Sequence, residues 1–114
     1  MDNLSRLKLE LSNKEYYTNE EYSVFLGENN LVPSDTYSKA TNEINLLNTV
    51  IAILETLAND TDMMRKIDSK DVMTIDQASK YLESRISNIN AKIIDIQESK
   101  NQSTGNINPI FFTR

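Results

Sequence analysis

The sequence predicts an all-α fold: a small helical bundle with two long antiparallel helices, short N-terminal helices and an extended C-terminal arm. The chain of 114 residues holds only two glycines and two prolines, so few residues favour tight turns. Apolar residues recur at steps of three and four over two long segments, which is the spacing of one face of a helix. The alternating pattern of a half-buried strand is found nowhere in the body of the chain.

The first twelve residues predict a short amphipathic helix. Leu4, Leu7 and Leu11 share one helical face over residues 3–12, and Leu9 lies off that face. We expect this helix to end near Asn13 and to bury only the face that carries the three leucines.

A second short helix is predicted by a capping box at Thr18 and Glu21. In this motif the hydroxyl accepts from the third helical amide, and the acid accepts from the amide of the cap. Tyr17, just before the cap, is placed to begin a hydrophobic staple. Gly27 is expected to end the helix in the left-handed conformation. The apolar residues of this helix are Tyr22, Phe25 and Leu26.

The clearest element is a helix that begins at a cap on Ser34 or Asp35 and runs to about Asn59. Two apolar flanks widen its stripe, so we expect it to be the central helix, packed on two sides. The first flank comprises Tyr37, Ala40, Ile44, Leu47, Ile51, Leu54 and Ala58, and the second comprises Leu46, Val50, Ile53 and Leu57.

The last long helix opens with another capping box, Thr74 with Gln77. A short connector separates it from the central helix, so the two long helices should lie antiparallel. Its apolar stripe is Ala78, Leu82, Ile86, Ile89, Ile93 and Ile96, with Tyr81 beside it and Lys80, Glu83, Arg85, Lys92 and Asp95 mostly on the other side.

Composition and charge exclude several function classes. The net charge is −5; residues 1–35 hold seven acids and three bases, whereas residues 76–114 hold four acids and five bases. An acidic chain without a basic stripe is a poor candidate for gripping nucleic-acid phosphates. Without a stretch of about 18 apolar residues or a signal-peptide pattern, we expect no membrane partner and a protein kept in the cytosol or in an assembly built there.

The absence of cysteine and histidine removes the usual side chains of catalysis and transition-metal binding. Magnesium could be held by paired acids three residues apart, and Asp68 with Asp71 has that spacing, but both fall in a connector. Asp60 and Asp62 stand at a helix end, where acids are usually caps or solvated turns. We therefore expect no enzymatic activity, no cofactor and no metal site.

The last sixteen residues, 99–114, predict an extended arm, and residues 1–98 predict one helical domain. The arm begins as a polar, structureless run from Ser99 to Asn106 and then becomes apolar. Such a segment either folds back onto the body or binds another molecule, for example as an added strand or a threaded peptide. We favour the second interpretation. The apolar residues are Ile107, Pro109, Ile110, Phe111 and Phe112.

Three parts of the sequence, taken together, resemble a known family. They are Arg6–Ser12 with the continuation Tyr22–Leu26, the segment Ile53–Asp60, and the segment Ala78–Ile86. With the order and size of the predicted helices, they are similar to small proteins of tailed bacteriophages and prophages known as head–tail connectors or adaptors. The resemblance covers about residues 4–98 and includes no catalytic motif.

What the resemblance implies is a virion structural protein at the head–tail interface, assembled in the cytoplasm of a bacterial host. Such adaptors form a ring, usually of twelve copies, beneath the portal protein. The ring prolongs the channel for double-stranded DNA and receives a neck, stopper or tail-terminator protein. A C-terminal arm commonly reaches into the portal, and Ile107–Thr113 occupies the corresponding place. We expect Asp60 and Asp62 to face the channel, and the portal-binding residues to be Ile107, Pro109, Ile110, Phe111, Phe112 and Arg114.

Two other function classes stay open at this point. The first is a small helical regulatory protein that inserts its C-terminal tail into a partner such as an enzyme. The second is a nucleotide-cleaving enzyme that would hold magnesium on Asp68 and Asp71.

Overall fold

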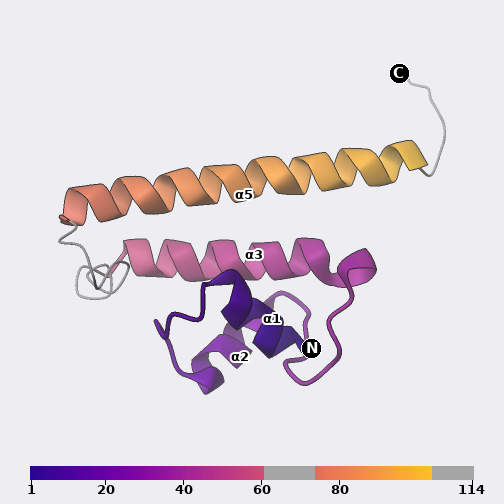
Figure 1. Ribbon diagram of the computed structural model, residues 1–114, viewed down its shortest axis with the longest axis horizontal. Helices are drawn as coiled ribbons and strands as arrows, with labels where there is room; N and C mark the ends of the chain where they lie inside the picture. Colours follow the sequence, from indigo (N-terminus) through magenta and orange to yellow (C-terminus); the bar gives the residue numbers. More distant parts are fainter. Residues whose placement is uncertain (61–73, 104–114) are drawn as a thin grey trace.

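The computed structural model describes residues 1–60 and 74–103, and within these ranges the chain is helical with short connections. The helices are α1 (Asn3–Glu10), α2 (Asn19–Glu28), α3 (Lys39–Ala58) and α5 (Ile75–Ser103) (Figure 1). The prediction of an all-α fold is confirmed for this part of the chain. The expected arm, apart from its first residues, lies outside the described residues.

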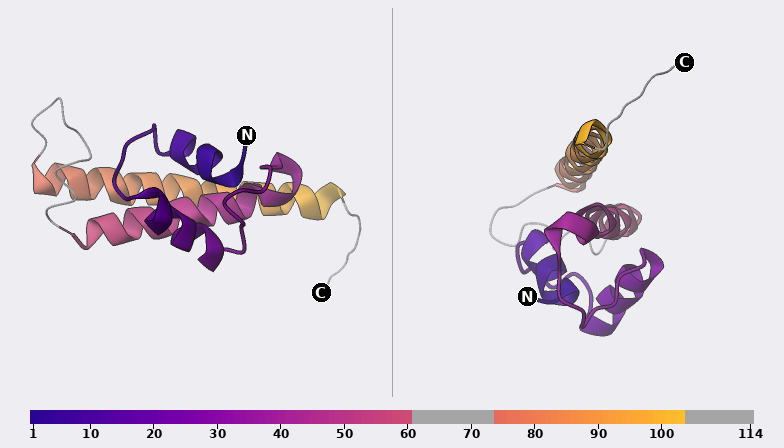
Figure 2. Two further views of the ribbon diagram at one scale, coloured as in Figure 1. Left: turned by 90° about the horizontal axis from the view of Figure 1, so that it is seen from below. Right: turned by 90° about the vertical axis from the view of Figure 1, so that its right-hand side faces the viewer.

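α3 forms the middle layer of the molecule. α5 lies along one side of α3 in the opposite direction, and α1 and α2 lie on the other side (Figures 1 and 2). An antiparallel arrangement brings Lys100 near the end of α5 to Ala40 at the start of α3, where the Nζ atom donates to the backbone carbonyl at 3.2 Å. A helix with apolar contacts on two sides needs a wide stripe, as the sequence predicted for this segment.

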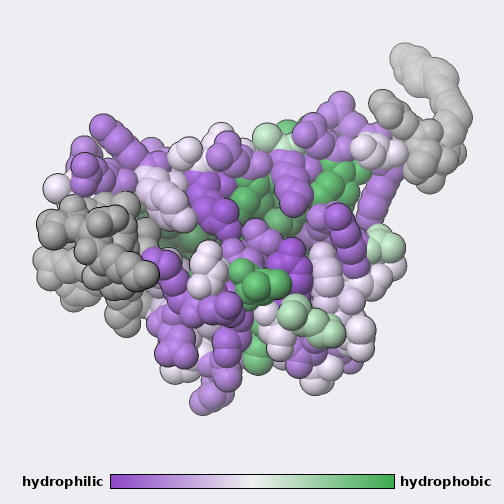
Figure 3. Space-filling model, viewed as in Figure 1, coloured by the Kyte–Doolittle hydropathy of each residue, from purple (hydrophilic) through white to green (hydrophobic). Residues whose placement is uncertain are grey.

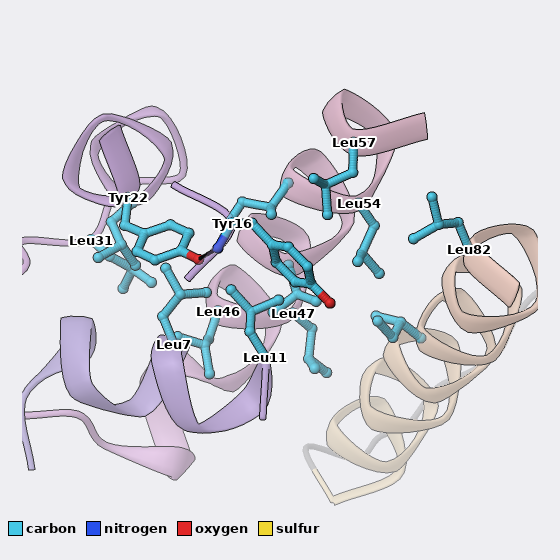
Figure 4. Close-up of a cluster of buried hydrophobic side chains, with 14 of the residues drawn as sticks. Leu7, Leu11, Tyr16, Tyr22, Leu31, Leu46, Leu47, Leu54, Leu57 and Leu82 are labelled. Carbon is cyan, nitrogen blue, oxygen red and sulfur yellow. Dashed lines mark hydrogen bonds between the residues drawn. The ribbon is translucent and has the colours of Figure 1, made fainter. Parts of the chain in front are cut away.

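The stripe of α3 is centred on the flank that the sequence analysis placed second. Leu46, Val50, Ile53 and Leu57 are each no more than 1% exposed. Of the first flank, Leu47 and Leu54 are buried, Ile44 and Ile51 are half-buried, and Ala40 and Ala58 are exposed. Burial of each large aliphatic side chain stabilises the fold by about 1.5–3 kcal/mol. Figure 4 shows Leu82 of α5 pointing toward Leu54 and Leu57, while Leu7 of α1 and Leu11, just after that helix, approach from the other side.

α1 is capped at both ends by local hydrogen bonds. The side chain of Asp2 accepts from the Ser5 amide at 2.7 Å at the N-terminus. At the C-terminus, Ser12 takes a positive φ of 60°, and the amides of Ser12 and Asn13 donate to the carbonyls of Leu9 and Lys8. This is the Schellman pattern of a helix end. Leu7 is buried and Leu9 is 50% exposed, as the helical spacing predicted.

α2 begins as predicted and ends differently. The reciprocal hydrogen bonds of the Thr18–Glu21 capping box are both present. Tyr17 meets Tyr22 with ring centroids 6.2 Å apart, which is the staple contact expected before the cap.

The prediction that Gly27 stops α2 is wrong. The helix continues through Glu28, and Asn30 is the residue with positive φ, 65°. The amides of Asn30 and Leu31 donate to the carbonyls of Gly27 and Leu26, which again closes a Schellman motif. Leu26 and Leu31 are both buried, as the apolar pair of this motif requires. Their burial favours a helix end at Glu28 over one at Gly27.

The predicted start of α3 at Ser34 or Asp35 is also wrong, because Ser38 is the N-cap. The residues before it pair with the N-terminus of the chain instead of forming helix. The amides of Asn3, Leu4 and Tyr37 donate to the carbonyls of Asp35, Pro33 and Met1. This pairing holds the segment extended over the start of α1.

α5 begins with the predicted Thr74–Gln77 capping box, whose reciprocal hydrogen bonds are 3.0 and 3.1 Å long. Its stripe packs on α3, with Ala78, Leu82, Ile89 and Ile93 buried. The expectation that the chain is structureless from Ser99 is wrong for residues 99–103, which are helical. The contact of Lys100 with α3 ties this last part of the helix to the body.

Candidate partner-binding surfaces

Of the residues that the sequence analysis selected for binding, the structure places only one. Asp60 is exposed just after α3, and its amide donates to the Leu57 carbonyl at 3.0 Å. The acids considered for a channel or a metal, Asp62, Asp68 and Asp71, lie outside the described residues. So do all of the selected arm residues, Ile107, Pro109, Ile110, Phe111, Phe112 and Arg114.

The link between α1 and α2 is built around the hydroxyl of Tyr22. This oxygen accepts from the amides of Tyr16 at 3.1 Å and Tyr17 at 3.4 Å, and its hydrogen is donated to the carbonyl of Lys14 at 3.0 Å. Figure 4 shows the ring between the two short helices with its oxygen next to the Tyr16 amide. Burial raises the pKa of Tyr22, which keeps the hydroxyl protonated and able to donate.

Beside this link lies a cavity of about 580 Å³, which we call the corner cavity. Asp60 and Glu21 give its rim two negative charges. Burial raises the pKa of Tyr17 beside them, and the charges of Asp60 and Glu21 raise this pKa further. Lys8 lies at the same rim and donates to the Asn19 side chain at 3.1 Å. The cavity offers aromatic and carboxylate groups, which suit cations and hydrogen-bond donors better than phosphates. It is lined by Lys8, Glu15, Tyr16, Tyr17, Thr18, Asn19, Glu21, Tyr22 and Asp60.

A second concave surface, of about 450 Å³, lies between the start of α3 and the end of α5. We call it the α3–α5 groove. Hydrophobic residues are visible along the seam between these helices, with hydrophilic residues on either side (Figure 3). Lys92 Nζ lies 3.9 Å from a carboxylate oxygen of Glu43 across the groove. The lining residues are Lys39, Ala40 and Glu43 of α3 and Lys92, Asp95, Ile96, Ser99 and Lys100 of α5.

The position of α5 relative to α1 is fixed by Arg85. Its Nη2 atom donates to the backbone carbonyl of Glu10 at 2.9 Å and lies 3.4 Å from the carboxylate of the same residue. Glu10 also pairs with Arg6 at 3.0 Å, and the Arg6 guanidinium lies 5.4 Å from the centre of the Tyr37 ring. A cation at the C-terminal end of α1 is also favoured by the helix dipole.

Neither the contact made by Arg85 nor the α3–α5 groove was predicted from the sequence. Arg85 was placed with the polar side of its helix, although it follows Leu82 by three residues and precedes Ile89 by four, which puts it at the edge of the buried stripe. That spacing could have predicted that Arg85 lies near the interface with the rest of the molecule. The groove had none, because it is formed by residues about fifty positions apart.

Within residues 1–60 and 74–103, no group of three or more acids is arranged to hold a metal ion. None of the described helices is long and apolar enough to cross a membrane. The chain matches no known family model, and comparisons with curated proteins and with solved structures found no match either.

Proposed function

We propose that this protein is a structural head–tail adaptor of a tailed bacteriophage. Copies of the chain form a ring, of about twelve by the resemblance, beneath the portal protein. The ring extends the DNA channel and connects the capsid to a neck or tail protein in the virion. The protein acts by assembly and has no enzymatic activity.

The observation that carries this proposal is the way the longest helix leads to the apolar tail. α5 is anchored on α3 along its buried stripe and by Arg85 to the end of α1, and it ends at Ser103. The segment with Ile107 and the phenylalanine pair follows only a few residues later. The packed helix therefore sets the starting point of the arm in every copy. Many such arms acting together give strong attachment even when each contact is weak.

The arrangement of helices and charges also agrees with this role. A bundle with two short N-terminal helices and two long antiparallel ones has the helix order expected of the adaptor family. The net charge of −5 suits a conduit, since acidic walls repel DNA and let it pass. We place Asp60 and Asp62 on the channel side in this proposal, and Asp60 is exposed as that requires.

Truncation after Asn106 tests the arm. The shortened chain should keep its helical circular dichroism but lose co-sedimentation with portal rings, and electron micrographs should show portals without the added ring. The double variant Phe111→Ala/Phe112→Ala should behave in the same way, while Asn106→Ala/Asn108→Ala serves as a matched control. Normal ring assembly by the truncated chain would contradict the proposed role of the arm.

The gene neighbourhood provides an independent test of the function class. An adaptor gene is expected between capsid or portal genes and tail genes. A position beside a single enzyme gene, with binding of that enzyme by the C-terminal tail, would instead favour a regulatory protein.

A further inference from the structure

The chain has an apolar groove and an apolar segment that are close to each other in the sequence. One is the α3–α5 groove, which ends at Ser99 and Lys100. The other is the segment 107–112, with Ile107, Pro109, Ile110, Phe111 and Phe112. Each would have to face water in the isolated protein if left alone, and exposed apolar patches are sites of association. Their proximity makes each the nearest available cover for the other.

The groove has room and suitable chemistry for some of the apolar side chains of this segment. Its volume of about 450 Å³ lies within the range of sites that hold small organic groups. Its apolar lining includes the exposed Ala40 and the half-buried Ile96. Lys92 and Lys100 also line it, and the aliphatic stems of lysines commonly cover apolar surface while the charge stays in water.

The carboxylate of Glu43 can accept further hydrogen bonds inside the groove. Its side chain is only 13% exposed, yet the Lys92 Nζ atom is 3.9 Å away, too far for a strong charge-assisted hydrogen bond. A carboxylate with so little water around it gains from a closer donor. Backbone amides of an extended segment, or the guanidinium of Arg114, are donors of the required kind.

The covalent connection allows the segment to return to the groove. The distance along α5 from Ser103 back to Lys92 is on the order of 16 Å. Phe111 lies eight positions after Ser103, and an extended chain of that length reaches on the order of 25 Å. Gly105 lies within the connecting stretch, where a reversal of direction is needed.

Attachment to the same molecule also decides between competing occupants. A short flexible link gives a tethered segment an effective concentration on the order of millimolar. The tail of a second copy at micromolar protein concentration is therefore outcompeted by the chain's own tail. An unrelated apolar peptide at low concentration is outcompeted for the same reason.

We propose that residues 107–112 fold back into the α3–α5 groove of the same molecule in the isolated protein. The groove then acts as a holding site that covers the phenylalanine pair until a partner with higher affinity takes the tail. The tail folds back in the isolated chain whether or not the eventual partner is a portal protein. We therefore expect partner binding to uncover Ala40 and Ile96.

A single tryptophan reports on the tail, because the natural chain has none. The variant Phe112→Trp should show blue-shifted emission and weak quenching by acrylamide in the full-length protein. Adding Ala40→Glu should shift the emission to the red and raise the quenching constant by about twofold or more, as the tail is displaced from the groove. Ala40 is exposed in the first turn of α3, where an added acid also suits the helix dipole. The matched control is Ala91→Glu, at an exposed position of α5 outside the groove.

Three results would overturn the inference. The first is red-shifted, strongly quenched emission from Phe112→Trp that Ala40→Glu does not change. The second is an equal response to Ala91→Glu. The third is emission that depends on protein concentration, which would assign the groove to the tail of another copy. Circular dichroism of each variant checks that α3 and α5 remain folded. A tail that is exposed here but still recruits portal rings would overturn this inference alone and leave the adaptor proposal in place.

Discussion

The N-terminal part of the molecule, residues 1–38, and the long helix α5 pack on the same central helix but are ordered in different ways. The N-terminal part is fixed internally by a dense set of backbone-directed hydrogen bonds, including those of Tyr22, those of Asn3 and the two Schellman ends. α5 is held by one apolar stripe, the Arg85 contacts and a few lysine contacts at its far end.

This difference predicts that the loops of the N-terminal part keep one conformation, whereas α5 can separate from α3 more easily. Each buried hydrogen bond to the backbone in the N-terminal part fixes one conformation of a loop. The apolar stripe of α5 stabilises contact with α3 but defines its register less strictly, since dispersion and burial have little directional preference. We therefore expect α5 to open locally at lower free energy than α1 and α2, as segments with one-sided packing do.

The largest effect on this contrast is expected from Leu82→Ala. The side chain is 1% exposed and points toward Leu54 and Leu57, so its truncation should lower the free energy of unfolding by about 2–5 kcal/mol. Urea unfolding measures the loss, and hydrogen exchange should accelerate more in α5 than in α2. Ser84→Ala, at an exposed position of the same helix, is the control. Equal acceleration in both helices would show that the two parts unfold as one unit.

Tyr22→Phe tests the polar anchoring of the N-terminal part. The variant keeps the ring but removes the hydroxyl that serves the Tyr16 and Tyr17 amides and the Lys14 carbonyl. Leaving these groups without a partner should cost about 1–3 kcal/mol of folding free energy. Tyr81→Phe removes a hydroxyl from a ring that is 45% exposed and should have almost no effect. Similar melting temperatures for the two variants would argue against Tyr22 as the anchor of the loop.

Arg85→Gln should have a smaller effect, about 1 kcal/mol, because the side chain is 30% exposed and water screens part of the interaction. The loss should appear as faster hydrogen exchange at the Glu10 end of α1 and around Arg85, since their direct contact is broken. Lys80→Gln, whose ion pair with Asp76 is largely exposed, is the matched control. Unchanged exchange in α1 would mean that apolar packing alone sets the position of α5.

The buried tyrosines predict a pH effect under alkaline conditions that vanishes at neutral pH. Burial raises the pKa of Tyr16 from 10.0 to about 12. Between these values the phenol ionises in the unfolded chain but stays protonated in the folded one, so stability is lost as the pH rises. The melting temperature should therefore fall from about pH 10 upward, and less steeply in Tyr16→Phe. Absorbance of tyrosinate at several pH values gives the ionisation directly. An identical decline in both proteins would place the effect elsewhere.

Short-range patterns predicted the parts of the fold that depend on near neighbours. The capping boxes at Thr18 and Thr74 involve residues three positions apart, and both formed as expected. The two-sided burial of α3 followed from the width of its apolar stripe. The errors arose where burial in the assembled core competes with local preference: Gly27 had the right chemistry for a stop, but Asn30 takes the positive φ, and Leu26 and Leu31 on either side of it are both buried.

The candidate binding surfaces also divide into features visible in the sequence and features that only packing creates. The apolar composition of residues 107–112 is visible in the sequence, and so is the lack of cysteine and histidine. The α3–α5 groove, the corner cavity and the Arg85 contact with Glu10 involve residues about 40 to 75 positions apart. No periodicity within one segment carries information about which distant segment it will face.

By itself the sequence determined that this chain is helical, which faces of its helices are apolar, and that its apolar tail follows the last helix. These properties depend on spacing within a few turns, where geometry is fixed by the 3.6-residue repeat. Only the tertiary structure decided where α2 ends, where α3 begins and which side chains meet across α3 and α5. Those outcomes depend on the sum of many weak contacts between segments, and that sum exists only once the helices are packed.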